Sequence, residues 1–153
     1  MKKFVAVLLA AMLCLSFAAC GGDKATDKTV DAAAMFQALL TDVTYTDNAT
    51  ELDSSMAGVL LGGELPDGTE AYLAANDSAY LRCAVFACKD KDAADAVKKL
   101  VQTYIDDSID AKYNVDEVAL LQNAKIHSMG NYVAVAVTSD TDNVNKVIDQ
   151  YFA

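Results

Sequence analysis

Residues 70–88 read EAYLAANDSAYLRCAVFAC, two apolar runs of strand length separated by an Asn-Asp-Ser turn at 76–78. Apolar runs of about four to eight residues that are bounded by turn-forming residues are typical of a β-hairpin. We therefore predict strands over residues 70–75 and 79–88, joined by a short turn.

A second hairpin is predicted further along the chain. Residues 124–128 and 132–139 are strand-like and flank the turn Met129-Gly130-Asn131. Along the second of these strands the side chains alternate between two faces. One face carries Val133, Val135 and Val137, and the other carries Tyr132, Ala134 and Ala136.

Amphipathic helices flank both hairpins. The strongest begins near Asp92, where apolar residues recur at the spacing of one helix face. This stripe consists of Ala93, Val97, Leu100, Val101, Tyr104 and Ile105. Further helices are predicted over residues 31–43, 53–61, 116–122 and 140–152.

The order of these elements is α-α-β-β-α-α-β-β-α, which predicts an α+β fold. We expect an antiparallel sheet of about four strands, built from the two hairpins, with amphipathic helices packed on one face. A chain of 153 residues is long enough for one domain with a real core.

The N-terminus differs from the rest of the chain. Met1-Lys2-Lys3 is basic, and residues 4–17 form an uncharged apolar run. A membrane-spanning helix needs about 20 apolar residues, so this run is too short for a permanent anchor and is typical of a signal peptide.

Phe17-Ala18-Ala19-Cys20 resembles the bacterial lipobox, whose Cys receives fatty acyl chains such as palmitate. We predict lipidation at Cys20, because two acyl chains hold a protein stably on a membrane and one does not. The alternative is an ordinary signal peptide cleaved near Ala19.

These features predict three segments and a location. Residues 1–19 form the signal peptide, residues 20–30 a lipid-attached flexible tether, and residues 31–153 a single α+β domain. The domain is expected on the extracytoplasmic face of the cell membrane, with the membrane itself as a partner through the lipid on Cys20.

The charge of the chain excludes one class of partner. The formal net charge is −10, and removal of the two lysines in residues 1–19 makes it −12. Such an acidic protein is repelled by nucleic acid, so no nucleic-acid partner is expected.

Cys83 and Cys88 are the cysteines of the predicted domain. They are five residues apart on one strand, which places them on opposite faces and about 16 Å apart. A disulfide requires Cα atoms within about 7 Å, so we predict two free thiols.

The residue types that commonly carry catalysis or bind metals in proteins do not form a recognisable motif in this sequence. His127 is the single histidine and is expected to face solvent. Asp140 and Asp142 superficially resemble a calcium loop, but Asn145 and Tyr151 stand where that loop has Gly and Glu. Weak calcium binding at Asp140 and Asp142 therefore stays open, and no catalytic residue, metal site or cofactor is predicted.

Residues 113–124, YNVDEVALLQNA, and the later Gly130-Asn131-Tyr132-Val133 carry a family resemblance. With the preceding acidic-capped helix, they make the chain similar to the family catalogued as domain of unknown function 4358 over about residues 30–152. The chain has Asn114-Val115 where that family is expected to have Pro after Tyr. The resemblance implies a lipoprotein anchored outside the cytoplasm of clostridia or their relatives, and it implies no activity.

The sequence therefore predicts a membrane-anchored extracytoplasmic lipoprotein of unknown activity. Its domain is expected to be non-enzymatic and to bind a protein or small ligand or assist an exported neighbour. The alternative is a cell-envelope hydrolase that uses some of the chain's 22 acidic residues.

Overall fold

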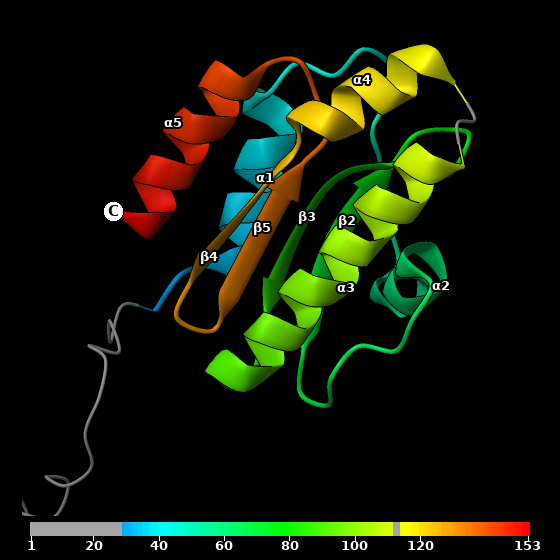
Figure 1. Cartoon of the computed structure of the whole chain (residues 1–153). Coiled ribbons are helices and arrows are strands. Elements are labelled where there is room, and N and C mark those ends of the chain that lie inside the picture. Colours follow the sequence, from blue (N-terminus) through cyan, green and yellow to red (C-terminus); the bar gives the residue numbers. More distant parts are fainter. Residues whose placement is uncertain (1–28, 112–113) are drawn as a thin grey trace, which may run out of the picture.

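The computed structural model describes residues 29–111 and 114–153, and in this part of the chain helices cover both faces of an antiparallel sheet (Figure 1). The strand order is β1-β2-β3-β5-β4, with bounds β1 Thr50–Leu52, β2 Glu70–Ala75, β3 Leu81–Ala87, β4 Lys125–Met129 and β5 Tyr132–Ala136. The helices are α1 Ala32–Asp42, α2 Ala57–Leu61 (after a 3-10 turn at Ser54–Met56), α3 Lys91–Asp110, α4 Val115–Asn123 and α5 Thr141–Phe152. The predicted α+β class and both predicted hairpins are confirmed.

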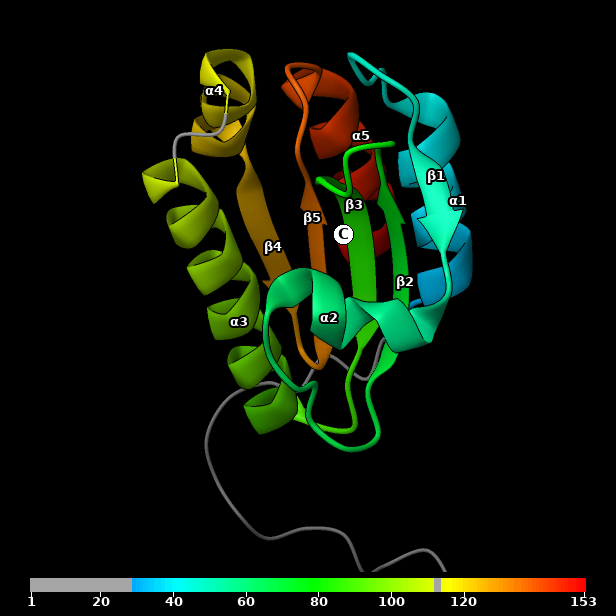
Figure 2. The ribbon, with the colours of Figure 1, turned by 90° about the vertical axis from the view of Figure 1, so that its right-hand side faces the viewer.

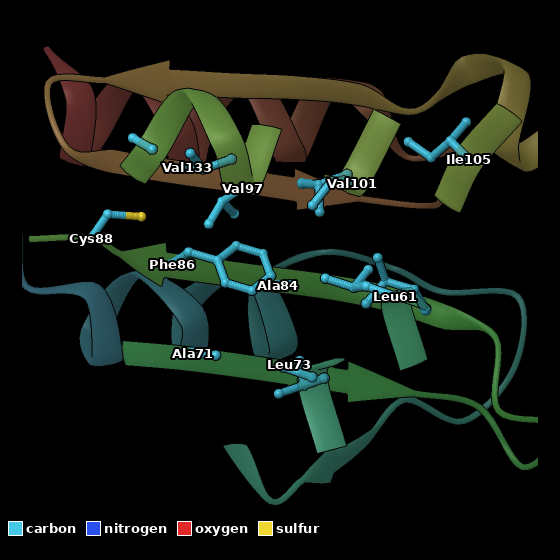
Figure 3. Packing of buried hydrophobic residues seen from close by; sticks show 14 of the residues in the cluster. Leu61, Ala71, Leu73, Ala84, Phe86, Cys88, Val97, Val101, Ile105 and Val133 are labelled. Carbon is cyan, nitrogen blue, oxygen red and sulfur yellow. The ribbon is translucent and has the colours of Figure 1, made fainter. Parts of the chain in front are cut away.

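One face of the sheet, here called the α3 face, packs against α2, α3 and α4. Val97, Val101 and Ile105 of α3 belong to one buried cluster with Phe86 of β3 and Val133 of β5 (Figure 3). Within the predicted α3 stripe, Leu100 and Tyr104 are only half-buried.

The opposite face, here called the α1 face, packs against α1 and α5. The strands present small side chains such as Ala74, Cys83 and Ala134 to it, and α1 fills the space with Phe36 and Leu39. Each of these five residues is fully buried. The two helix layers lie on either side of the sheet in the second view (Figure 2).

The prediction that helices pack on one face only is therefore wrong. The physical reason lies in the central strands β3 and β5, whose side chains are buried on both sides almost without interruption. A strand that is apolar at every position needs cover on both faces, as in sheets enclosed by two helical layers.

The sheet also has one strand more than expected. β1 is three residues long, Thr-Glu-Leu, and it pairs antiparallel with the end of β2. Two of its three residues are exposed, so the segment lacks the apolar run or alternation that marks a strand.

The helix starts follow their capping residues. Asp31 accepts a hydrogen bond from the Ala34 amide and caps α1, at the start of the predicted helix over residues 31–43. α3 begins earlier than expected, because Asp90 rather than Asp92 caps it by accepting from the Ala93 amide at 2.8 Å. Val30, placed in the tether by the sequence prediction, is buried in the α1 face.

The turn of the second hairpin is fixed to β3. Gly130 adopts a φ of +56°, which glycine tolerates without a steric penalty. Asn131 then brackets Cys88, because its side-chain amide donates to the Cys88 carbonyl at 2.5 Å and its own carbonyl accepts from the Cys88 amide at 2.8 Å.

Candidate functional site

A buried ionic cluster lies where β3 begins. Arg82 is 1% exposed, and its guanidinium lies between Asp47, from the loop after α1, and Glu117, from α4. Its Nε and one Nη donate to the two Asp47 oxygens at 2.7 and 2.9 Å, and its two Nη atoms donate to the Glu117 oxygens at 2.8 Å. Each carboxylate is 35 residues away from Arg82 in the chain, so the cluster joins three separate segments.

The guanidinium of Arg82 uses all five of its N–H groups. Four serve the two carboxylates, and the fifth donates to the Leu81 carbonyl at 3.2 Å. No donor is left over for a phosphate or carboxylate ligand. The cluster is thus built as a clamp between β3, α4 and the loop after α1.

The ionisation of the cluster supports this structural role. Burial alone lowers the pKa of Arg82, but hydrogen bonds to Asp47 and Glu117 outweigh it and raise that pKa above its usual value. The hydrogen bond from Arg82 lowers the pKa of Asp47 to about 2. Acid–base catalysis by a carboxyl pair needs one member with a raised pKa, and the shift at Asp47 is the opposite.

Two tyrosines hold the backbone around the cluster. The Tyr104 hydroxyl, from α3, accepts a hydrogen bond from the Leu81 amide at 3.0 Å. The Tyr45 hydroxyl donates to the Leu39 carbonyl at 2.9 Å. Burial raises the pKa of both phenols, so both stay protonated and serve as fixed hydrogen-bonding groups.

Cys83 and Cys88 are free and buried, as predicted. Cys83 belongs to the α1 face and Cys88 to the α3 face, where Figure 3 labels it. Burial raises the pKa of Cys83 to about 11 and also raises the pKa of Cys88. A protonated, buried thiol is a poor nucleophile, so neither residue is placed for thiolate chemistry.

His127 does not face solvent as expected. It is half-buried on the α1 side of β4, opposite Ala134, and its Nε2 is buried without a hydrogen-bond partner among the described residues. Burial lowers the pKa of His127, nearby Lys125 lowers it further, and Asp149 of α5 raises it. The alternation along β4 correctly separated His127 from Ile126. The prediction of a solvent-facing His127 was wrong because the α1 face is itself covered by helices.

The Asp-rich turn before α5 has a structural use. Asp140 accepts hydrogen bonds from the Thr44 amide and the Asn143 side chain, both at 2.9 Å, so it links the loop after α1 to the start of α5. The bond from Thr44 is the main cause that lowers the pKa of Asp140. Within residues 29–111 and 114–153, no group of three or more His, Cys, Asp or Glu side chains is arranged to hold a metal ion.

The surface of the described domain has hollows, among them one of about 390 Å³ and one of about 220 Å³. The larger of these lies between the 3-10 turn and the start of β2 and includes Ser55, Leu65 and Thr69 in its lining. The smaller lies between the end of α2 and the last turns of α3.

The predicted lipidation site, Cys20, and the predicted signal peptide lie outside the described residues. Across the two described ranges, no helix combines the length and the apolar character needed to cross a membrane.

Comparison with known proteins finds a matching family model. Residues 66–138 match the family model for DUF4358, a domain of unknown function. The chain therefore resembles this family, over a span that is narrower than the predicted residues 30–152. No curated protein and no solved structure matches the chain significantly.

The matched span of DUF4358 runs from the turn before β2 through β5, so it includes α3 and α4. Within it, the residues that suggested the resemblance have clear structural roles. Asn114 caps α4 by accepting from the Asp116 amide, Glu117 binds Arg82, and Asn131 brackets Cys88. α1, β1, α2 and α5 lie outside the matched span.

The Arg82 cluster was not found from the sequence, although one signal pointed to it. Arg82 is the single arginine of the chain and interrupts the apolar run of a buried strand. A buried charge must be paired, so this position alone implies acidic partners. Which of the 22 acidic residues are those partners depends on the tertiary fold.

Proposed function

We propose that the protein is exported and held by a lipid on Cys20 at the extracytoplasmic face of the cell membrane, where its domain serves as a non-enzymatic binding or accessory module. The observation that carries this proposal is the Phe17-Ala18-Ala19-Cys20 sequence directly after a basic start and a 14-residue apolar run.

The physical case for the anchor rests on length and on acyl chains. The apolar run is shorter than the roughly 20 residues of a spanning helix, so it suits a cleaved signal peptide. Each buried CH₂ of an acyl chain adds about 0.8 kcal/mol, so two chains hold a protein stably. An acidic domain is repelled from an anionic bilayer, which favours a domain that extends away from the surface on its tether.

The binding or accessory role is favoured over the hydrolase alternative by the state of the two carboxylates that bind Arg82. Asp47 and Glu117 form a closely placed acidic pair, and Arg82 binds both of them. Because Arg82 lowers the pKa of Asp47, this carboxyl is unsuited to act as a general acid.

The anchor is tested by replacing Cys20 and a matched cysteine. Cys20→Ala is expected to leave the protein unlipidated, either unprocessed or released from the membrane fraction. Cys14→Ala, in the apolar run itself, is the control and should still yield a diacylated protein. Intact-mass measurement of the membrane fraction distinguishes the two.

A released wild-type protein with an unmodified N-terminal Cys20 would contradict the anchor. It would instead support an ordinary signal peptide cleaved near Ala19.

A further inference from the structure

The smaller hollow forms a groove between two helices, here called the α2–α3 groove. Its lining comes from the end of α2 and the last turns of α3, and includes Leu60, Leu61, Tyr104, Asp107, Ser108 and Ala111. Apolar side chains therefore form most of its wall, and Asp107 with Ser108 supplies a polar edge.

Exposed apolar side chains occur in the short segment that supplies Leu60 and Leu61 to the groove. In the described part of the chain, three large hydrophobic residues are exposed: Met56 (43%), Val59 (74%) and Val115 (84%). Met56 and Val59 lie three residues apart, in the turn before α2 and in α2 itself, and Val59 directly precedes the lining residue Leu60 in the chain. Residues three or four apart share one side of a helix, so this short segment presents an apolar surface to water.

The segment after α2 packs closely against α3 beside the groove. A Cβ on Gly63 would lie 2.7 Å from Leu100 Cδ1, so a glycine lets the end of α2 approach α3 closely. Gly62 ends α2 with a φ of +73°, a conformation that side chains disfavour. Tyr104 is fixed by the hydrogen bond from the Leu81 amide.

The electrostatics of the groove are unusual for a helix end. Asp107 lines the groove, and Asp106 and Asp110 are exposed near it in the last turns of α3, whose last turn contains no basic residue. The C-terminus of a helix carries a partial negative charge, so acidic side chains there are unfavourable. Residues that are locally unfavourable for the fold tend to occur at functional sites. A cation bound here would relieve the repulsion between these aspartates and the negative end of α3.

The size of the groove indicates what occupies it. Pockets for drug-sized ligands have volumes of about 300–1,000 Å³, and this hollow of about 220 Å³ is smaller. It suits an apolar side chain of a protein partner, with Met56 and Val59 extending the contact. The acidic edge requires that the partner carry positive charge beside this apolar group.

We propose that the α2–α3 groove docks a protein segment that combines an apolar anchor side chain with neighbouring Lys or Arg residues. The apolar anchor enters between Leu60 and Tyr104, and the basic residues meet the acidic end of α3. This inference rests on the binding role in the proposed function, but it does not depend on the lipid at Cys20.

The test uses the full chain, purified in detergent and immobilised, and a display library of random 12-residue peptides as the probe. The proposal predicts enrichment of peptides that carry an apolar residue near Lys or Arg. Their affinity should fall at least about tenfold with Val59→Asp, which places a charge on the apolar contact. Asp107→Asn should weaken binding by about two- to fivefold, the range of an exposed ion pair.

Val115→Asp is the matched control, because Val115 is also highly exposed but belongs to α4, whereas Val59 directly precedes the lining residue Leu60 in α2. It should leave peptide binding unchanged, and both variants should retain the wild-type circular dichroism spectrum. Raising the salt concentration should weaken the peptides that depend on their basic residues.

Three results would overturn the proposal. The first is no peptide enriched on the wild-type chain over the Val59→Asp chain. The second is enrichment of peptides without basic residues. The third is a wild-type chain that sediments as a dimer and becomes monomeric with Val59→Asp, since the occupant would then be a second copy. Lipidation of Cys20 is measured separately by mass, so failure of the groove and failure of the anchor give different results.

Discussion

The two faces of the sheet are built by opposite means. On the α3 face, large strand residues such as Phe86 and Val133 meet medium-sized helix residues such as Val97 and Val101. On the α1 face the strands are lined mainly with alanine and Cys83, and the helix supplies the bulk through residues such as Phe36. The difference shows that a strand with small side chains can be fully buried when the helix that faces it supplies large side chains.

The faces also differ in whether the helices that cover them lie inside the span matched by the DUF4358 model. α3 and α4 lie inside residues 66–138, whereas α1 and α5 lie outside. Both layers meet at Arg82, because Asp47 follows α1 and Glu117 belongs to α4. The ionic cluster therefore connects the matched and the unmatched parts of the domain.

The largest expected effect comes from breaking this connection. Arg82→Met should lower the free energy of unfolding by about 3–5 kcal/mol, because Glu117 is then a buried charge without a partner. Urea denaturation followed by circular dichroism measures the change.

The double variant Arg82→Met with Glu117→Gln serves as the control. It should be clearly less destabilised than the sum of the two single variants, because the buried charge has been removed along with its partner. A cost below about 1 kcal/mol for Arg82→Met alone would mean that the cluster does not connect the two layers.

A second prediction compares leucines on the two faces. Leu39 of α1 is fully buried, so Leu39→Ala should cost about 2–5 kcal/mol. Leu100 of α3 is half-buried, so Leu100→Ala should cost less than about 2 kcal/mol. Chemical denaturation of both variants gives the comparison, with exposed Gln37→Ala expected within about 0.5 kcal/mol of wild type.

The reverse order, with Leu100→Ala as the more damaging change, would contradict the fold. It would mean that α1 adds little cover to the sheet and that a single helical layer, as first predicted from the sequence, describes the domain better.

The strands and most helices were predictable from local patterns. β2 matches its predicted span of residues 70–75, and the split of Val133 from Ala134 between faces followed from alternation. The second helical layer was missed, although the nearly unbroken apolar run of β3 contained the signal for it. α1 was predicted as a helix, but nothing local shows which face of the sheet a helix covers.

The candidate site was far less predictable than the fold. Arg82 signals a buried charge, yet its partners are 35 residues away on either side. The α2–α3 groove likewise brings Leu60 and Leu61 of α2 together with Tyr104 of α3, residues that are far apart in sequence. Pairings of this kind arise from tertiary packing, which residue spacing does not encode.

The two thiols, one on each face of the sheet, allow a further comparison of the faces with a smaller expected effect. Cys83→Ala and Cys88→Ala, on opposite faces, should each cost about 1 kcal/mol through lost packing. Since the residues share no contact surface, the double variant should equal the sum within about 0.5 kcal/mol. Protein without residues 1–20, kept unreduced, should show two thiols that react with a thiol reagent only after denaturation. A Cys83–Cys88 disulfide found by non-reducing mass spectrometry would contradict the β3 geometry.

The smallest expected effect concerns His127, which belongs to β4 and is half-buried on the α1 face of the sheet. Burial lowers its pKa in the folded state below 6.5, so between these two pKa values the unfolded chain binds more protons. Stability from the neutral imidazole is therefore complete above pH 6.5 and is lost as the pH falls through the folded pKa. His127→Gln should remove the part of the pH dependence of unfolding that develops as the pH falls below 6.5.

The neighbours of His127 sharpen this prediction, because they act in opposite directions. Asp149 raises the pKa of His127 and Lys125 lowers it. Asp149→Asn should therefore move the imidazole titration to lower pH, and Lys125→Gln should move it to higher pH. As the chain has one histidine, its ring protons give an assignable NMR titration. A wild-type pKa at or above 6.5 would mean that α5 does not shield this edge of the α1 face, because an imidazole open to water has no reason to favour its neutral form.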